Sequence, residues 1–210
     1  EGGAWRSTEI EILRDPKKST VDSKLATESS RSYDFVLLAF YGNVEIIQYS
    51  NGTKENRMYL NYPHDYITDK TFKIHGQREL ACLDACREIS KVIVKKAVDE
   101  SVALAAANST NIRMERSREM FDDAIRNSPL GRTVIYSCDT NQTASDNPSF
   151  TQTLIDDGSD MARKTPTAKV LTIKEIFDVA APKMASINHP QKPIYEGGRR
   201  ITHLPFAVSI

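Results

Sequence analysis

Four short segments of the chain are dominated by apolar residues, and each is typical of a strand inside a sheet. The clearest covers residues 34–41, which continue without polar alternation up to Gly42. A continuous apolar run of this length predicts a strand covered on both faces, as in a parallel sheet. Shorter runs occupy residues 10–13, 79–84 and 133–138. Together they predict a largely buried central sheet.

Helical patterns alternate with these predicted strands. They cover residues 20–30, 89–108, 114–127, 150–157 and 172–185. Gly158 is expected to end the fourth helix as a C-cap, which leaves residues 158–168 as an exposed linker. Thr172 and Glu175 form a capping-box pattern at the start of the fifth. Strands that alternate with helices are typical of an α/β sandwich with a mostly parallel sheet.

Two further segments predict strands outside the buried runs. Residues 44–49 and 57–61 flank Asn51-Gly52, a strong signal for a β-hairpin. Residues 204–208 predict an edge strand in the tail. In open α/β sheets, ligands and chemistry gather at the carboxyl ends of the strands. The positions to inspect are therefore residues 42–43, 84–86 and 137–139.

Composition and charge remove several classes of function. Lysine plus arginine and aspartate plus glutamate both number 28, so the net charge is zero, which argues against a dedicated nucleic-acid binder. No apolar run approaches the ~18 residues that cross a bilayer, and no signal-peptide pattern is present. The cysteines number three, without zinc-site spacing, which favours free thiols in a reducing, cytoplasmic setting.

The predicted strand ends carry motifs that resemble those of the caspase-like cysteine peptidases, on the metacaspase and paracaspase side. Residues 83–87 (LDACR) are similar to the nucleophile segment, an apolar strand that ends in aspartate, any residue and the catalytic cysteine. Residues 136–146 (YSCDTNQTASD) resemble the substrate-pocket strand and loop of metacaspases. Segments 150–154, 172–177, 191–193 and 205–206 follow in the family's order, so the resemblance spans residues 10–208.

This resemblance implies a fold and a domain organisation. The expected fold is α/β, a caspase-like three-layer sandwich with a mostly parallel central sheet and helices on both faces. Residues 1–210 would form one peptidase domain. Residues 1–130 would be its large-subunit-like part, with a helical insertion at about 89–127, and residues 131–210 its small-subunit-like part. The family's first strand and helix have no counterpart here, so we expect that unit to be absent or supplied by a separate piece.

The resemblance also assigns catalytic positions. Cys86 stands at the nucleophile position, and backbone amides near Gly42 and Cys86 would form the oxyanion hole. Asn43 follows Gly42 where the family has its general-base histidine, and an amide neither accepts nor releases a proton near neutral pH. We therefore expect a weakened or inactive catalytic pair. Two alternatives stay open: Cys86 could be a small buried hydrophobe, or His64 or His75 could supply the imidazole.

Substrate specificity is expected to come from acidic residues. Asp84 and Asp139 would build a pocket for arginine or lysine, with Ser137, Cys138 and Gln142 from the same strand and loop as further substrate-binding residues. Arginine suits such a pocket because its planar guanidinium can bind carboxylates in pairs. The alternative is that one of the aspartates caps a helix or turn. No cofactor or metal is expected; calcium dependence, as in some metacaspases, stays open, although no EF-hand spacing is present.

The function predicted from the resemblance is a cysteine endopeptidase, synthesised as a zymogen, that cleaves proteins after arginine or lysine in a form weakened by Asn43. The alternative is a pseudo-protease that binds peptides or a partner protein and signals without cutting. A third hypothesis is a processed subunit whose sheet is completed by an upstream fragment or a regulatory partner chain. Protein or peptide substrates are the expected partners, with neither nucleic acid nor membrane.

Overall fold

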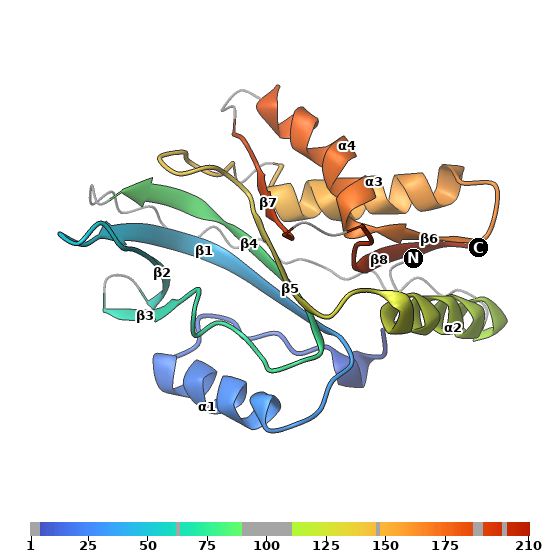
Figure 1. The fold of residues 1–210 in the computed structure, drawn as a ribbon, viewed down its shortest axis with the longest axis horizontal. Coiled ribbons are helices and arrows are strands. Elements are labelled where there is room, and N and C mark those ends of the chain that lie inside the picture. Colours follow the sequence, from blue (N-terminus) through green and yellow to red (C-terminus); the bar gives the residue numbers. More distant parts are fainter. Residues whose placement is uncertain (1–4, 62–63, 90–110, 146–147, 187–190, 199–200) are drawn as a thin grey trace.

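A six-stranded mixed sheet forms the centre of the molecule, and helices cover both of its faces (Figure 1). The computed structural model describes residues 5–61, 64–89, 111–145, 148–186, 191–198 and 201–210. The side chain of Cys86 lies outside this described part, whereas its backbone is inside it. The sheet strands are β1 (Val36–Gln48), β2 (Lys54–Asn61), β3 (Asp65–Thr68), β4 (Arg78–Ile89), β5 (Gly131–Tyr136) and β7 (Ile194–Glu196).

The strand order in the sheet is β3-β2-β1-β4-β5-β7, with parallel pairing at the centre and antiparallel pairing toward both edges. The central strands β1, β4 and β5 are parallel, as the buried apolar runs predict. The outer pairings of β2 with β1, β3 with β2 and β7 with β5 are antiparallel. The hairpin predicted at Asn51-Gly52 joins β1 to β2 and is confirmed. Strands β6 (Lys169–Thr172) and β8 (Pro205–Ser209) form a separate antiparallel pair.

The pleat of β4 divides the core into two halves. The helices are α1 (Lys18–Ser29), α2 (Asn111–Asn127), α3 (Phe150–Lys164) and α4 (Ile173–Ala185), and a 3-10 turn covers Ser7–Glu9. Leu80 and Cys82 pack with buried side chains of α3 and α4, whereas Leu83 and Ala85 pack on the opposite face with Val21 of α1. Because each fully buried aliphatic or aromatic side chain contributes about 1.5–3 kcal/mol, both layers are held firmly to the sheet.

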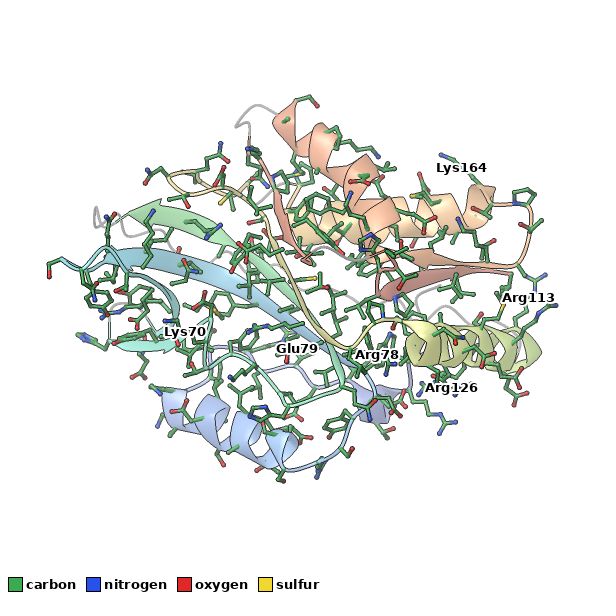
Figure 2. All side chains as sticks on the ribbon, in the orientation of Figure 1. Lys70, Arg78, Glu79, Arg113, Arg126 and Lys164 are labelled. Carbon is green, nitrogen blue, oxygen red and sulfur yellow. The ribbon has the colours of Figure 1, made fainter. Side chains whose placement is uncertain are left out.

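The start of β4 is anchored by buried charged groups. Arg78 donates through Nε to Ser128 O (2.9 Å) and through Nη2 to Arg126 O (3.0 Å), which satisfies carbonyls at the end of α2. Glu79 pairs with Arg132 Nε at 2.7 Å, and burial raises the pKa of the Glu79 carboxyl. Arg78 and Glu79 lie at the end of the sheet that α2 approaches (Figure 2). These contacts fix where β4 begins, and therefore which of its residues lie beside β1.

Gly42 does not end the first central strand, contrary to the prediction. Parallel pairing between β1 and β4 runs without a break from Val36–Glu79 to Ile46–Ile89. Antiparallel pairing with β2 begins at Asn43, on the other edge of β1. Hydrogen bonds to both neighbours therefore carry the strand through the glycine, and the two predicted segments 34–41 and 44–49 form one strand.

Gly158 is not a helix C-cap, and the linker predicted after it is wrong as far as Lys164. The glycine lies inside α3, where an added Cβ would be 3.3 Å from Ile176 Cδ1 and 3.4 Å from Phe206 Cε1. Its role is to let α3 approach α4 and β8 closely. The capping box at Thr172 is confirmed, because Thr172 N donates to Glu175 Oε2 at 2.7 Å and Glu175 N donates to Thr172 Oγ1 at 3.3 Å.

The strand predicted at residues 10–13 is also wrong. These residues follow the 3-10 turn without joining a sheet, and Ile12 and Leu13 are 60% and 40% exposed. An apolar run forms a strand only where a neighbouring strand accepts its backbone hydrogen bonds. The helices predicted near residues 20–30 and 114–127 are confirmed as α1 and α2. The helix predicted at residues 89–108 falls almost wholly outside the described residues.

Candidate active site

Asn43 and Cys86 occupy directly paired positions on adjacent parallel strands. In the ladder between β1 and β4, Gly42 is the partner of Ala85 and Asn43 is the partner of Cys86. Adjacent strands lie about 4.8 Å apart. On the other side of β1, Asn43 pairs with Tyr59 of β2. The family's base and nucleophile positions are therefore neighbours in the backbone, although residues 43 and 86 are far apart in the chain.

Neither position lies at a strand end, where the chemistry was expected. β1 continues to Gln48 because β2 pairs with its second half. β4 continues to Ile89, and Arg87 forms an isolated antiparallel bridge with Gln142 from the loop after β5. The paired positions thus lie within the sheet, with neighbouring backbone on both sides of β4.

Asp84 is a buried carboxylate at the start of α3. Asp84 is 2% exposed, and its Oδ2 accepts a hydrogen bond from Thr151 N at 2.7 Å. Oδ1 accepts no hydrogen bond from the described residues. Burial raises the pKa of this carboxyl, and the backbone and hydroxyl of Thr151, with smaller help from Ser137 and Ser149, oppose the shift. Asp84 therefore binds the first turn of α3, whose N-cap is Ser149, and its Oδ1 has no hydrogen bond within the described part of the chain.

Asp139 lies in a more open environment than Asp84. Its side chain is 41% exposed, and Oδ2 is 3.6 Å from Lys192 Nζ. Its Oδ1 accepts a hydrogen bond from the N–H of the next residue, Thr140, at 2.7 Å. Each of the two predicted specificity residues thus has a backbone N–H to bind, and only Asp84 is enclosed.

Ser137, Cys138 and Gln142 contact the backbone of the segment around Cys86. Ala85 N donates to Ser137 Oγ at 3.0 Å, and the same hydroxyl donates to Ala85 O at 3.2 Å. The Cys138 thiol lies 3.3 Å from Ala85 O. Arg87 N donates to Gln142 O at 3.1 Å. Ser137 and Cys138 are completely buried, so in this structure their side chains contact the protein's own backbone.

The two candidate histidines lie in different places. His75 precedes β4, and at about 3.3 Å per residue the stretch from Arg78 to Cys86 is roughly 26 Å long. His75 is therefore at the wrong end of the strand to supply an imidazole to Cys86. His64 is exposed in the turn between β2 and β3, where its backbone N–H donates to Asn61 O at 2.9 Å. It stands in the connection between strands that are separated from β4 by β1.

Three residues near Cys86 escaped the sequence analysis as site residues. Thr151 binds Asp84, as described above. Arg87 places its guanidinium carbon 4.0 Å from the centre of the Tyr136 ring and donates through Nη1 to Cys138 O at 3.5 Å. Gln191 is 1% exposed and donates through Nε2 to Ser137 O at 3.1 Å. All three lie in segments that carry the family resemblance (83–87, 150–154 and 191–193), but no local pattern indicated the contacts that they make.

Metal ligands and membrane spans were sought in the part of the chain that the structure describes. There, no group of three or more histidine, cysteine, aspartate or glutamate side chains is arranged to hold a metal ion. None of the helices in that part combines the length and apolar character that crossing a bilayer requires.

The fold and this site define the class of protein: a layered α/β domain with a cysteine and a buried aspartate on a central parallel strand. A family model described as the caspase domain, Peptidase C14, matches residues 6–200. The match covers most of the chain, which therefore belongs to the caspase family of cysteine peptidases. A search of curated proteins returned no significant match. The predicted family and α/β fold class are thus confirmed.

Proposed function

We propose that this caspase-domain chain is a cysteine endopeptidase that cleaves after arginine or lysine, and that Asn43 makes it a slow one. The observation that carries the proposal is the direct pairing of Asn43 with Cys86 across β1 and β4. It supports a nucleophile and a base position held next to each other by sheet hydrogen bonds. The side chain at the base position is an amide, which cannot take the thiol proton.

The chemistry is acyl transfer. A Cys86 thiolate would add to the peptide carbonyl carbon, the C–N bond would break, and the leaving amine would take a proton. Water would then release the acyl group from sulfur. A free thiol has a pKa of about 8.5, so only a few per cent is thiolate at pH 7. Without an imidazole to accept the thiol proton and return it to the amine, only this small fraction reacts.

Asp84 supports the preference for a basic residue. Its Oδ1 accepts no hydrogen bond from the described residues, and a buried carboxylate oxygen without a donor is costly. A substrate guanidinium would supply a donor and a compensating charge. An aspartate side chain from a substrate would instead add a second negative charge beside the first. Asp139 would join the pocket by exchanging Lys192 for the substrate.

The alternative function is a pseudo-protease that binds peptides or a partner protein without cutting them. The observation that favours it is again Asn43, because neither β1 nor β5, the described strands that flank β4, carries a histidine. Both functions need the same pocket, so binding does not separate them. Turnover does.

An arginine chloromethylketone peptide tests the proposal. Mass spectrometry of the digested chain should locate the alkyl group on Cys86, and the matched aspartate chloromethylketone should label it at least tenfold more slowly. Cys86→Ala is the control for label elsewhere. Preference for the aspartate probe would reject the basic specificity. Equal, slow labelling of Cys86 by both probes would reject a formed substrate pocket.

A further inference from the structure

The turn after β5 holds the backbone on both sides of Cys86. We call this turn the clamp, defined by residues Ser137, Cys138, Asn141 and Gln142. The ladder between β4 and β5 ends at the pair Leu83–Tyr136. Beyond it, side chains and loop backbone replace strand β5 as hydrogen-bond partners of β4. The clamp is therefore an extension of the sheet, built from a turn.

The clamp binds the residue before Cys86 and the residue after it. Before Cys86, the Ser137 hydroxyl accepts from Ala85 N (3.0 Å) and donates to Ala85 O (3.2 Å). After Cys86, Arg87 N donates to Gln142 O (3.1 Å) and Asn141 N donates to Arg87 O (2.7 Å). Asn141 has a positive φ of 65°, so the turn adopts a left-handed residue to place its backbone here. The backbone N–H and C=O groups of the two residues that flank Cys86 are thus held by four hydrogen bonds from one turn.

Gln191 fastens the clamp to the end of α4. Its Nε2 donates to Ser137 O (3.1 Å), and its Oε1 accepts from Ser145 N (2.5 Å). Its own backbone N–H donates to Met184 O (3.1 Å), near the end of α4. The next residue, Lys192, donates its backbone N–H to Gln142 Oε1 (2.8 Å). Gln191 is 1% exposed, and its bond to Ser137 O is buried and thus shielded from water.

We infer that Gln191 is a positioning residue for the Cys86 nucleophile, acting through the clamp. The inference rests on the proposed function for the role of Cys86, but not for the contacts. A glutamine amide suits this place because it donates at one end and accepts at the other, and it bridges Ser137 and Ser145, which belong to opposite ends of one loop. Its loss removes a buried hydrogen bond to Ser137 O and a part-buried one from Ser145 N. The loop then relaxes, and the peptide groups beside Cys86 lose their fixed orientation.

The test uses Gln191→Met in the full chain, because methionine keeps the length of the side chain and removes both hydrogen bonds. Hydrogen exchange followed by mass spectrometry should show at least tenfold faster exchange of the Ala85 and Arg87 amides. The rate of Cys86 alkylation by iodoacetamide should be measured from pH 5 to 10. In the variant, the pH dependence of this rate should differ from that of the native chain, because the peptide dipoles beside Cys86 no longer point in one direction.

Matched variants separate positioning from loss of stability. Phe121→Leu removes buried carbon from a different cluster, packed with Trp5 and Phe35, and should leave the Cys86 profile unchanged. Ser137→Ala cuts the clamp directly and should reproduce the effects of Gln191→Met, which keeps the inference testable if the glutamine variant does not fold. An unchanged Cys86 profile in a folded Gln191→Met chain, or the same shift in Phe121→Leu, overturns the inference. Neither readout requires peptide cleavage, so a chain that fails to label with the arginine probe would count against the proposed function alone.

Discussion

Replacing Asn43 with histidine should raise the peptidase activity of this chain. The pairing of Asn43 with Cys86 places the new imidazole on the adjacent strand, about 4.8 Å away in the backbone, where it can reach a thiol at ~3 Å. General acid–base catalysis by a positioned side chain contributes roughly 10²–10⁴ in rate. This is about 3–5 kcal/mol of transition-state stabilisation. We therefore expect kcat/KM on an arginine peptide substrate to rise by at least 100-fold.

The assay is release of a fluorescent amine from an arginine peptide amide between pH 5 and 9. The Asn43→His rate should rise through about pH 6.5 as the imidazole loses its proton, a limb that the native chain lacks. Asn43→Gln is the matched control, because it lengthens the side chain without adding a titrating group. Asn43→His combined with Cys86→Ala must be inactive. Equal rates for Asn43→His and Asn43→Gln would remove residue 43 from the mechanism and refute the reasoning.

Three further outcomes follow from buried polar groups. Burial raises the pKa of Asp84, so its ionisation lowers stability as the pH rises through that raised value. In urea unfolding, the free energy of unfolding of Asp84→Asn should therefore rise relative to that of the native chain from pH 4 to pH 8. The same variant should lose at least tenfold in arginine-probe labelling, and no loss of labelling would dismiss Asp84 as a specificity residue. Arg132→Met removes the charge partner of the buried Glu79 carboxylate, which should lower the free energy of unfolding by about 3 kcal/mol at pH 7.5. The loss should be smaller at pH 4, where Glu79 can be protonated. A pH-independent loss would show that the charge pair is not the cause. Thr172→Ala should cost about 1 kcal/mol in unfolding free energy without changing Cys86 alkylation, and a change in that alkylation would connect the cap of α4 to the site.

The sequence predicted those parts of the fold that local pattern determines. Apolar runs located the central strands, and the capping box at Thr172 located the start of α4. Glycine was misread twice, because a glycine can end an element or permit close packing and the sequence does not distinguish the two. At Gly42, pairing with the two neighbouring strands lets β1 continue through the glycine. At Gly158, the nearby side chains of Ile176 and Phe206 favour a residue without a Cβ inside α3.

The candidate site was predictable as positions but not as contacts. The resemblance placed Asn43 and Cys86 at neighbouring strand positions, and the register gives this pairing a physical basis. The bond from Thr151 to Asp84 and the bond from Gln191 to Ser137 join segments more than fifty residues apart. Such contacts depend on how α3 and α4 pack on the sheet, which no local pattern encodes.

The burial of Cys82 has a practical consequence for optical studies of this chain. Desolvation against the helical layer raises the pKa of its thiol to about 12, so at pH 7 only about one molecule in 10⁵ carries a thiolate there. Cys138, the other described thiol, is fully enclosed. A maleimide dye added to the native chain should therefore react slowly with Cys82 and Cys138, and rapid labelling of either one would report that the helical layer has opened.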